Sequence, residues 1–296
     1  LLALSFGGNK YRWDSGSTIA LFVVGIFLTI VALIYDFAIF PRFKTVRNNI
    51  KYQPLMKWEN FKKPGIFTAN TAVFFMNCAF SIQMVYIVQF FQLTYNDTAW
   101  KAAVHLLAAV IPTVVTVITT GIFNSKTGYI KPIIVFGGVT GVVGAGLLTL
   151  LDNNSTSSQH IGLLILPGVA FGAILQSTML GCQNQVDKTS PTARIDFISV
   201  VTLNNFLKTL GNAFGGIVCE TVFSASVLNK FKQKHISLGA TNTVDELIIY
   251  RGEHFDGAHS VIGDLISASI KNVFYMALGC AALTFIAAAL TSNKKN

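Results

Sequence analysis

Long apolar runs separated by polar segments make up most of this chain. A helix that crosses the hydrocarbon core of a bilayer, about 30 Å thick, needs about 20 mostly apolar residues. Runs of this kind lie at residues 17–40, 65–93, 102–123, 132–151, 161–181, 195–223 and 272–291. The pattern therefore predicts an all-α, polytopic membrane protein.

The order of these runs predicts two parts. Residues 1–64 hold the end of one helix, one intermediate transmembrane helix and a basic loop. Residues 65–296 hold a six-helix transmembrane bundle, in which residues 224–271 form a long loop. The chain begins at Leu1 inside an apolar stretch, without an initiator Met or the basic start of a signal peptide. We therefore expect a fragment that further helices precede.

Composition and charge support a membrane protein and argue against a nucleic-acid partner. Only 12% of the residues are charged, whereas an average soluble domain is about one quarter charged. The net charge of +9 would suit nucleic acid if the basic residues shared one soluble face. They lie instead in loops, and the loop at 41–64 contains Arg42, Lys44, Arg47, Lys51, Lys57, Lys62 and Lys63. Because cytoplasmic loops are rich in Lys and Arg, we place this loop in the cytoplasm.

The opposite side of the membrane carries a second signal. The chain contains N-x-S/T triplets at Asn96, Asn153 and Asn154, which are acceptor patterns for glycosylation. All three fall in loops that alternate to the non-cytoplasmic side, as does the loop at 224–271. These candidates agree with the sidedness that the basic loop predicts.

The run at 195–223 carries the most informative polar residues. Asp196, Asn204, Lys208 and Asn212 recur at multiples of four residues, so we expect them to share one helix face. A charge deep in the bilayer is costly and normally faces a protein interior or a water-filled cavity. Lys208 is therefore a candidate for a substrate or proton pathway, and Asn204, Asn212 and Asp196 are candidates on the same face. A structural ion pair with another helix, or a side chain that reaches the interface, would explain it equally well.

Two glutamines and one histidine are weaker candidates. Gln83 and Gln176 lie deep enough in their runs to bind a substrate in a central cavity. Hydrogen bonds between helices are the simpler explanation for both. His105, near the outer end of its run, has the chemistry of a proton shuttle, although an ordinary residue at the membrane boundary would look the same.

Enzyme, metal and cofactor signatures are weak. The four cysteines form no C-x-x-C pair, and no G-x-x-x-x-G-K-[ST] phosphate loop is present in the sequence. The polar residues at 253–259 have the composition of a solvated loop and give no sign of a tetrahedral metal site. We expect no enzyme activity, no metal and no cofactor.

Several motifs carry a resemblance to a known family. The stretch LLALSFGGNKYRWDSG at 1–16 resembles the fungal drug:proton antiporters of the 14-helix branch of the major facilitator superfamily. The stretch GIFNSKTGYIKP at 121–132 resembles the short cytoplasmic loop motif of that superfamily. The residues that match this motif are Gly121, Lys126, Gly128 and Lys131. Ser125 stands where the motif usually has an acidic residue.

Within that branch the chain most resembles the yeast vacuolar basic amino acid transporters. The segments that carry this likeness are VQFFQL at 88–93, SASVLNK at 224–230 and FDGAHS at 255–260. The resemblance implies one intermediate helix followed by a C-terminal six-helix bundle, with a missing N-terminal bundle as the other wall of the cavity. It also implies proton-coupled antiport of Lys, Arg or His across a fungal vacuolar or plasma membrane, by alternating access.

Other functions remain open beside this one. Multidrug efflux by the same proton antiport fits the same branch of the family. A transport-inactive membrane remnant, or an interaction partner, would fit a fragment. The expected partners are a small-molecule substrate, protons, the lipid bilayer and the missing N-terminal bundle.

Overall fold

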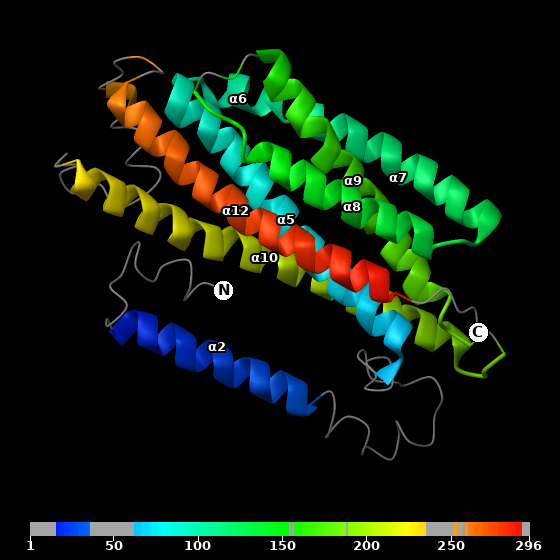
Figure 1. Cartoon of the computed structure of the whole chain (residues 1–296). Helices are drawn as coiled ribbons and strands as arrows, with labels where there is room; N and C mark the ends of the chain where they lie inside the picture. Colours follow the sequence, from blue (N-terminus) through cyan, green and yellow to red (C-terminus); the bar gives the residue numbers. More distant parts are fainter. Residues whose placement is uncertain are drawn as a thin grey trace.

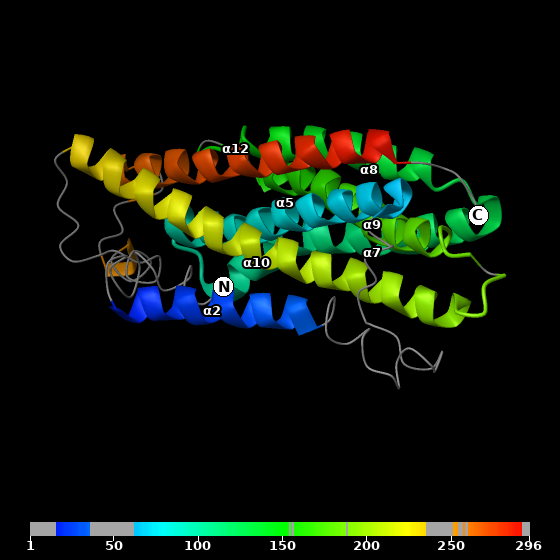
Figure 2. The same ribbon diagram turned by 90° about the horizontal axis from the view of Figure 1, so that it is seen from below.

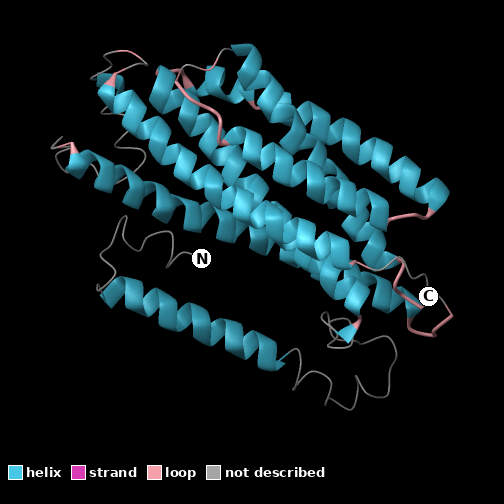
Figure 3. Cartoon of the chain, in the orientation of Figure 1, coloured by secondary structure: helices cyan, strands magenta, loops and turns pink. Residues whose placement is uncertain are grey.

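The computed structural model describes residues 16–35, 62–153, 155, 157–187, 189–234, 251–253, 257 and 260–291. Every regular element in this part of the chain is a helix (Figure 3). The all-α fold class predicted from the sequence is therefore confirmed. The helix end before residue 9, most of the basic loop at 41–64 and Asn154 lie outside the described residues.

Eight helices are described. They are α2 (Gly16–Ile34), α5 (Pro64–Tyr95), α6 (Ala99–His105), α7 (Leu107–Thr127), α8 (Lys131–Leu148), α9 (Ser157–Gln183), α10 (Ala193–Gln233) and α12 (Val261–Leu290). Helices α6 and α7 form one apolar stretch, Ala99–Thr127, and six such stretches in the described residues are long and apolar enough to cross a membrane. Helix α2 has 19 residues without a charge and lies outside the bundle on the side of α10 (Figure 1).

Helix ends follow local chemistry. Pro64 opens α5, where its missing N–H would have no partner in any case. Gly128 ends α7 with φ 67° and donates its N–H to the carbonyl of Asn124. This left-handed position favours glycine. Ser260 precedes α12 and accepts a hydrogen bond from the N–H of Gly263, so α12 begins earlier than its apolar run suggests.

The loop predicted at 224–271 is too long at both ends. Helix α10 continues to Gln233, and α12 begins at Val261. Phe231 is 1% exposed and Ile266 is 0% exposed, because both belong to the main apolar core. The buried face of each helix thus extends past the apolar run, while charged residues on the other faces hide this extension from a hydropathy scan. At about 1.5 Å per residue, the 41 residues of α10 exceed the thickness of a bilayer core.

Helix α5 is the centre of the bundle. It packs against α12, α10 and α9, while α9 also packs against α7 and α8. Figure 2 shows α5 between α12 and α10, and in Figure 1 α5 crosses behind α12. The arrangement places polar side chains of α5, α9 and α10 within reach of one another.

Two glycine pairs bring helices into backbone contact. A methyl group on Gly211 would overlap the carbonyl oxygen of Phe74, and one on Gly215 would lie 2.5 Å from the carbonyl oxygen of Cys78. The second pair lies on α9, where a methyl group on Gly168 would overlap the carbonyl oxygen of Ala109 on α7. One on Gly172 would lie 2.6 Å from the carbonyl oxygen of Thr113 on α7. The small-xxx-small spacing therefore marks the α10–α5 and α9–α7 contacts.

We expect Gly211→Ala to destabilise the bundle. The added methyl group meets backbone of α5, which has no rotamer with which to retreat, so a cost of about 1–3 kcal/mol is expected. The unfolding temperature of the purified protein measures the effect. Gly279→Ala on α12 is the matched control, because nothing lies within 4 Å of that added methyl group. Equal unfolding temperatures for the two variants would contradict the close α10–α5 contact.

Candidate functional site

A buried polar cluster joins three helices in one half of the bundle. The Nδ2 of Asn204 on α10 donates to Oδ1 of Asn70 on α5 at 2.9 Å. The thiol of Cys182 on α9 lies 3.7 Å from the same oxygen. All three side chains are at most 3% exposed. Neither Nδ2 of Asn70 nor Oδ1 of Asn204 has a hydrogen-bond partner among the described residues.

Lys208 lies one helical turn from this cluster. It follows Asn204 by four residues on α10 and is partly buried. No described side chain forms a hydrogen bond or ion pair with its ammonium group. A partly buried ammonium without a fixed partner has unused capacity to bind an anionic group.

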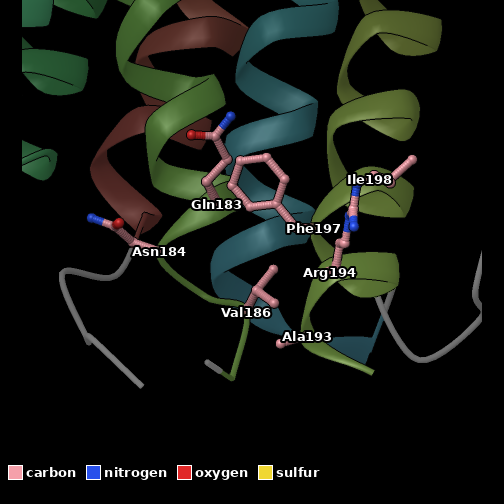
Figure 4. Close-up of a pocket in the computed structure, with 7 residues that line it drawn as sticks. All are labelled: Gln183, Asn184, Val186, Ala193, Arg194, Phe197 and Ile198. Atoms are coloured by element: carbon pink, nitrogen blue, oxygen red, sulfur yellow. The ribbon is translucent and has the colours of Figure 1, made fainter. Parts of the chain in front are cut away.

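A pocket of about 700 Å³ opens at the end of the α9–α10 pair. Figure 4 shows the ring of Phe197 of α10 beside Gln183 at the end of α9, with Arg194 on α10 and Asn184 just past α9. Arg194, Phe197, Val201 and Lys208 follow one another on α10 at spacings of three, four and seven residues, which places them on one side of the helix. Lys208 therefore lies about 21 Å from Arg194 along that side.

The connection from α9 to α10 carries one negative charge beside this pocket. The carboxylate of Asp187 accepts hydrogen bonds from the N–H and the hydroxyl of Thr189, at 2.9 and 2.6 Å. These bonds lower the pKa of the Asp187 carboxyl below its ordinary value. Asp187 is therefore negatively charged at neutral pH.

The other predicted pathway residues are not brought to this cluster. Asn212 is exposed, and its backbone carbonyl accepts a hydrogen bond from the hydroxyl of Ser81. Gln83 is 3% exposed, and its Oε1 has no partner among the described residues. Gln176 packs beside Gly121 of α7.

The shared face predicted for Asp196 is wrong. Asp196 lies in the first turn of α10 and accepts a hydrogen bond from Thr192 at 2.7 Å. Twelve residues separate it from Lys208, and at 3.6 residues per turn this turns the two side chains apart by about 120°. Spacings of four drift steadily around a helix, so they hold a face over one or two turns only.

The loop motif has a structural centre that the sequence did not single out. Asn124, buried inside the motif, donates to the hydroxyl of Ser177 on α9 at 2.9 Å. Gly128 supplies the turn after it, while Lys126 is exposed and Lys131 is partly buried. The motif thus fixes the C-terminal end of α7 against α9.

The glycosylation candidates differ in access. Asn96 is exposed at the end of α5, with φ 54°. Asn153 is 3% exposed and donates its Nδ2 to Asp264 at 2.6 Å. Since a glycan attaches to that nitrogen, the geometry favours Asn96 over Asn153 as an acceptor. Asn154 lies outside the described residues.

Arg251 is a buried cation that the sequence did not distinguish from a solvated loop. It is 1% exposed and donates from Nε to the carbonyl of Leu93, near the end of α5, at 3.2 Å. Its Nη2 donates to the carbonyl of Gly257 at 2.6 Å and to the hydroxyl of Ser260 at 3.0 Å. The cation thus ties the end of α5 to the start of α12, where it also favours the α5 dipole.

No group of three His, Cys, Asp or Glu side chains in the described part of the chain is placed to hold a metal ion. The polar residues that the structure brings together are amides, a thiol and an ammonium group. Such a set can form hydrogen bonds with polar or anionic groups.

Asn204→Ala is expected to destabilise the protein by about 1–3 kcal/mol, because it leaves the buried Oδ1 of Asn70 without its donor. The unfolding temperature of the purified protein measures this. Asn205→Ala is the matched control, since the neighbouring Asn205 is exposed. A loss of stability in the control variant alone would contradict the buried pairing.

Arg251→Ala is expected to cost about 1.5–3 kcal/mol for each charged hydrogen bond that is lost and not replaced by water. Glu253→Ala, two residues along and exposed, should change little. Urea unfolding of both variants tests the difference. Equal midpoints would show that Arg251 is not held as described.

Comparison with known proteins agrees with these features. Residues 2–216 match the profile of the Major Facilitator Superfamily. Azole resistance protein 1 of Saccharomyces cerevisiae is 56% identical over 295 residues, which are 100% of this chain and 48% of that protein. Vacuolar basic amino acid transporters 3 and 5 of the same yeast are each 46% identical over 295 residues, all of this chain and 64% and 51% of their own lengths.

The chain therefore spans between about half and about two thirds of the length of these curated relatives. The match covers most of the chain and includes the loop motif at 121–132. Together with six helices of membrane-spanning length, it confirms the resemblance predicted from the motifs and identifies a multi-pass integral membrane protein. The chain belongs to the Major Facilitator Superfamily.

Proposed function

We propose that the complete protein is a secondary transporter that exchanges basic amino acids for protons across a fungal vacuolar or plasma membrane. The observation that carries this proposal is Lys208, a partly buried ammonium group without a partner among the described residues. The names of two relatives, vacuolar basic amino acid transporters 3 and 5, support the substrate class.

Lys208 suits the part of the substrate that all amino acids share. Its ammonium group would pair with the α-carboxylate. Asn204 lies one turn before Lys208 on α10 and is hydrogen-bonded to Asn70 of α5, whose Nδ2 has no partner among the described residues. The pocket beside Arg194 and Phe197 lies on the same side of α10 and would be the entrance from one side of the membrane.

The cationic side chain of the substrate needs negative groups elsewhere. The Arg194–Lys208 side of α10 is basic, so it would repel a second cation. We propose that a further bundle, which the lengths of the relatives leave room for, supplies the carboxylates and forms the other wall of the cavity. Alternating access would then come from rocking of the two bundles around this site.

Azole efflux is a second candidate, favoured by the 56% identity to Azole resistance protein 1. Azole drugs carry no carboxylate for Lys208 to pair with. The two functions therefore differ in their need for this residue. Transport by a protein of the second kind would tolerate the loss of the ammonium group.

Lys208→Ala in the full-length protein is expected to reduce proton-dependent uptake of labelled lysine into membrane vesicles about tenfold or more. A charged hydrogen bond contributes about 1.5–3 kcal/mol, and 1.4 kcal/mol corresponds to about tenfold in affinity. Lys232→Ala, an exposed lysine at the end of the same helix, is the control. Normal lysine uptake by Lys208→Ala would rule out the proposed contact. If the wild type transports no lysine and cells without the protein lose azole tolerance, efflux is favoured.

A further inference from the structure

Two histidines from different helices meet at one end of the bundle. His105 ends α6, and His160 lies in the first turns of α9. Their ring centroids are 6.4 Å apart and the rings are nearly perpendicular, at 86°. This end also holds the α5–α6 connection with Asn96, which the predicted topology places on the non-cytoplasmic side. We refer to it as the outer end of the bundle.

Aromatic rings of α5 hold both imidazoles. Phe91 stacks on His105 with a centroid distance of 3.9 Å and meets His160 edge-on at 5.0 Å. Phe90 and Tyr95 lie 6.2 and 5.7 Å from His160. His160 is only 4% exposed, and its Nε2 has no hydrogen-bond partner among the described residues. Packing alone would be served as well by an apolar ring, so the unpaired nitrogen calls for another explanation.

One acid stands beside the pair. Oδ2 of Asp97 lies 3.9 Å from Nε2 of His105, and Oδ1 of Asp97 accepts from the ammonium group of Lys101 at 2.6 Å. The side chain of Asp97 is 10% exposed, whereas that of Lys101 is 68% exposed. Lys101 can therefore leave Asp97 for water at little cost, which frees the carboxylate for a charged imidazole.

The other charged and titratable groups at this end are already engaged or point to solvent. The hydroxyl of Tyr95 donates to the carbonyl of Asn153, whose Nδ2 is bound by Asp264 of α12. Asp152, which precedes α9, is exposed. Arg251 is bound to the carbonyl of Leu93. Asp97 is thus the acid that is placed to pair with His105 when the imidazole is protonated.

We propose that His105 and His160 form a proton-binding site at the outer end, loaded from the solution on that side of the membrane. A proton on His105 strengthens its contact with Asp97 and displaces Lys101. A proton on Nε2 of His160 turns an unpaired acceptor into a donor and places a second positive charge 6.4 Å from the first. The two charges repel across the α6–α9 contact, so loading of both sites favours separation of α6 from α9 at this end.

The inference rests on the proposed proton coupling but not on any choice of substrate. Histidine is suited to the role because its unperturbed titration falls between about pH 6 and 7. The pair gives the outer end a response to acidification on that side. Transport and stability are two separate readouts of this response.

The first test measures the unfolding temperature of the purified full-length protein between about pH 5 and about pH 8. The wild type should lose at least about 2 °C on acidification through this range, because the second charge enters an apolar pocket without an acceptor. His160→Gln should remove most of this loss. His235→Gln removes an imidazole from elsewhere in the sequence and should leave it unchanged. An equal loss in His160→Gln and the wild type would overturn the site.

The second test measures proton-driven uptake of labelled lysine against outer pH in vesicles with equal amounts of each protein. His160→Gln should make the pH dependence shallower than that of the wild type and of His235→Gln, with uptake retained at the optimum. An unchanged pH profile would overturn the role in transport. Absence of lysine transport by the wild type would refute the proposed substrate, while the unfolding measurement would still decide whether the histidines bind protons.

Discussion

The position of every polar group in the bundle depends on how closely α10 and α9 approach their neighbours. Lipid chains are as apolar as leucine side chains, so burial of apolar surface does not drive these helices together within a bilayer. Close packing of helix backbones at Gly211, Gly215 and Gly168 holds the helices together instead. The contact at Gly211 sets α10 against α5, and Asn204 meets Asn70 two turns away along the same pair of helices.

The sequence predicted the fold well because the bilayer imposes a simple rule. Apolar runs of spanning length became α5, the α6–α7 stretch, α8 and α9, with small differences at the ends. The rule failed where helices leave the apolar layer. Phe231 and Ile266 continue the buried faces of α10 and α12 beyond their apolar runs, but Lys230, Lys232 and Asp264 on other faces dilute the hydropathy.

Prediction of the site was less complete, since a sequence shows which polar residues lie in apolar runs but not which of them are buried or meet. Lys208 and Asn204 lie one turn apart on α10, whereas Asp196 was assigned to their face by a spacing that drifts around the helix. Asn70 was one of several amides in its run, and only the α5–α10 crossing distinguishes it. Arg251 lies in a polar segment whose apolar neighbours, LII at 247–249, were the available sign of burial.

Arg251 and Lys208 show why burial of a cation does not by itself define a site. Arg251 donates hydrogen bonds to two carbonyls and a hydroxyl of its own chain. A guanidinium whose N–H groups are engaged in this way has less capacity to bind a ligand. Near Lys208, the amides of Asn204 and Asn70 are hydrogen-bonded to each other. No described side chain accepts a hydrogen bond from the Lys208 ammonium group. The first cation therefore holds the outer ends of α5 and α12 in place. In the proposed function, Lys208 keeps its binding capacity for the substrate. This difference in partners, rather than depth or charge, makes Lys208 the better candidate for substrate contact.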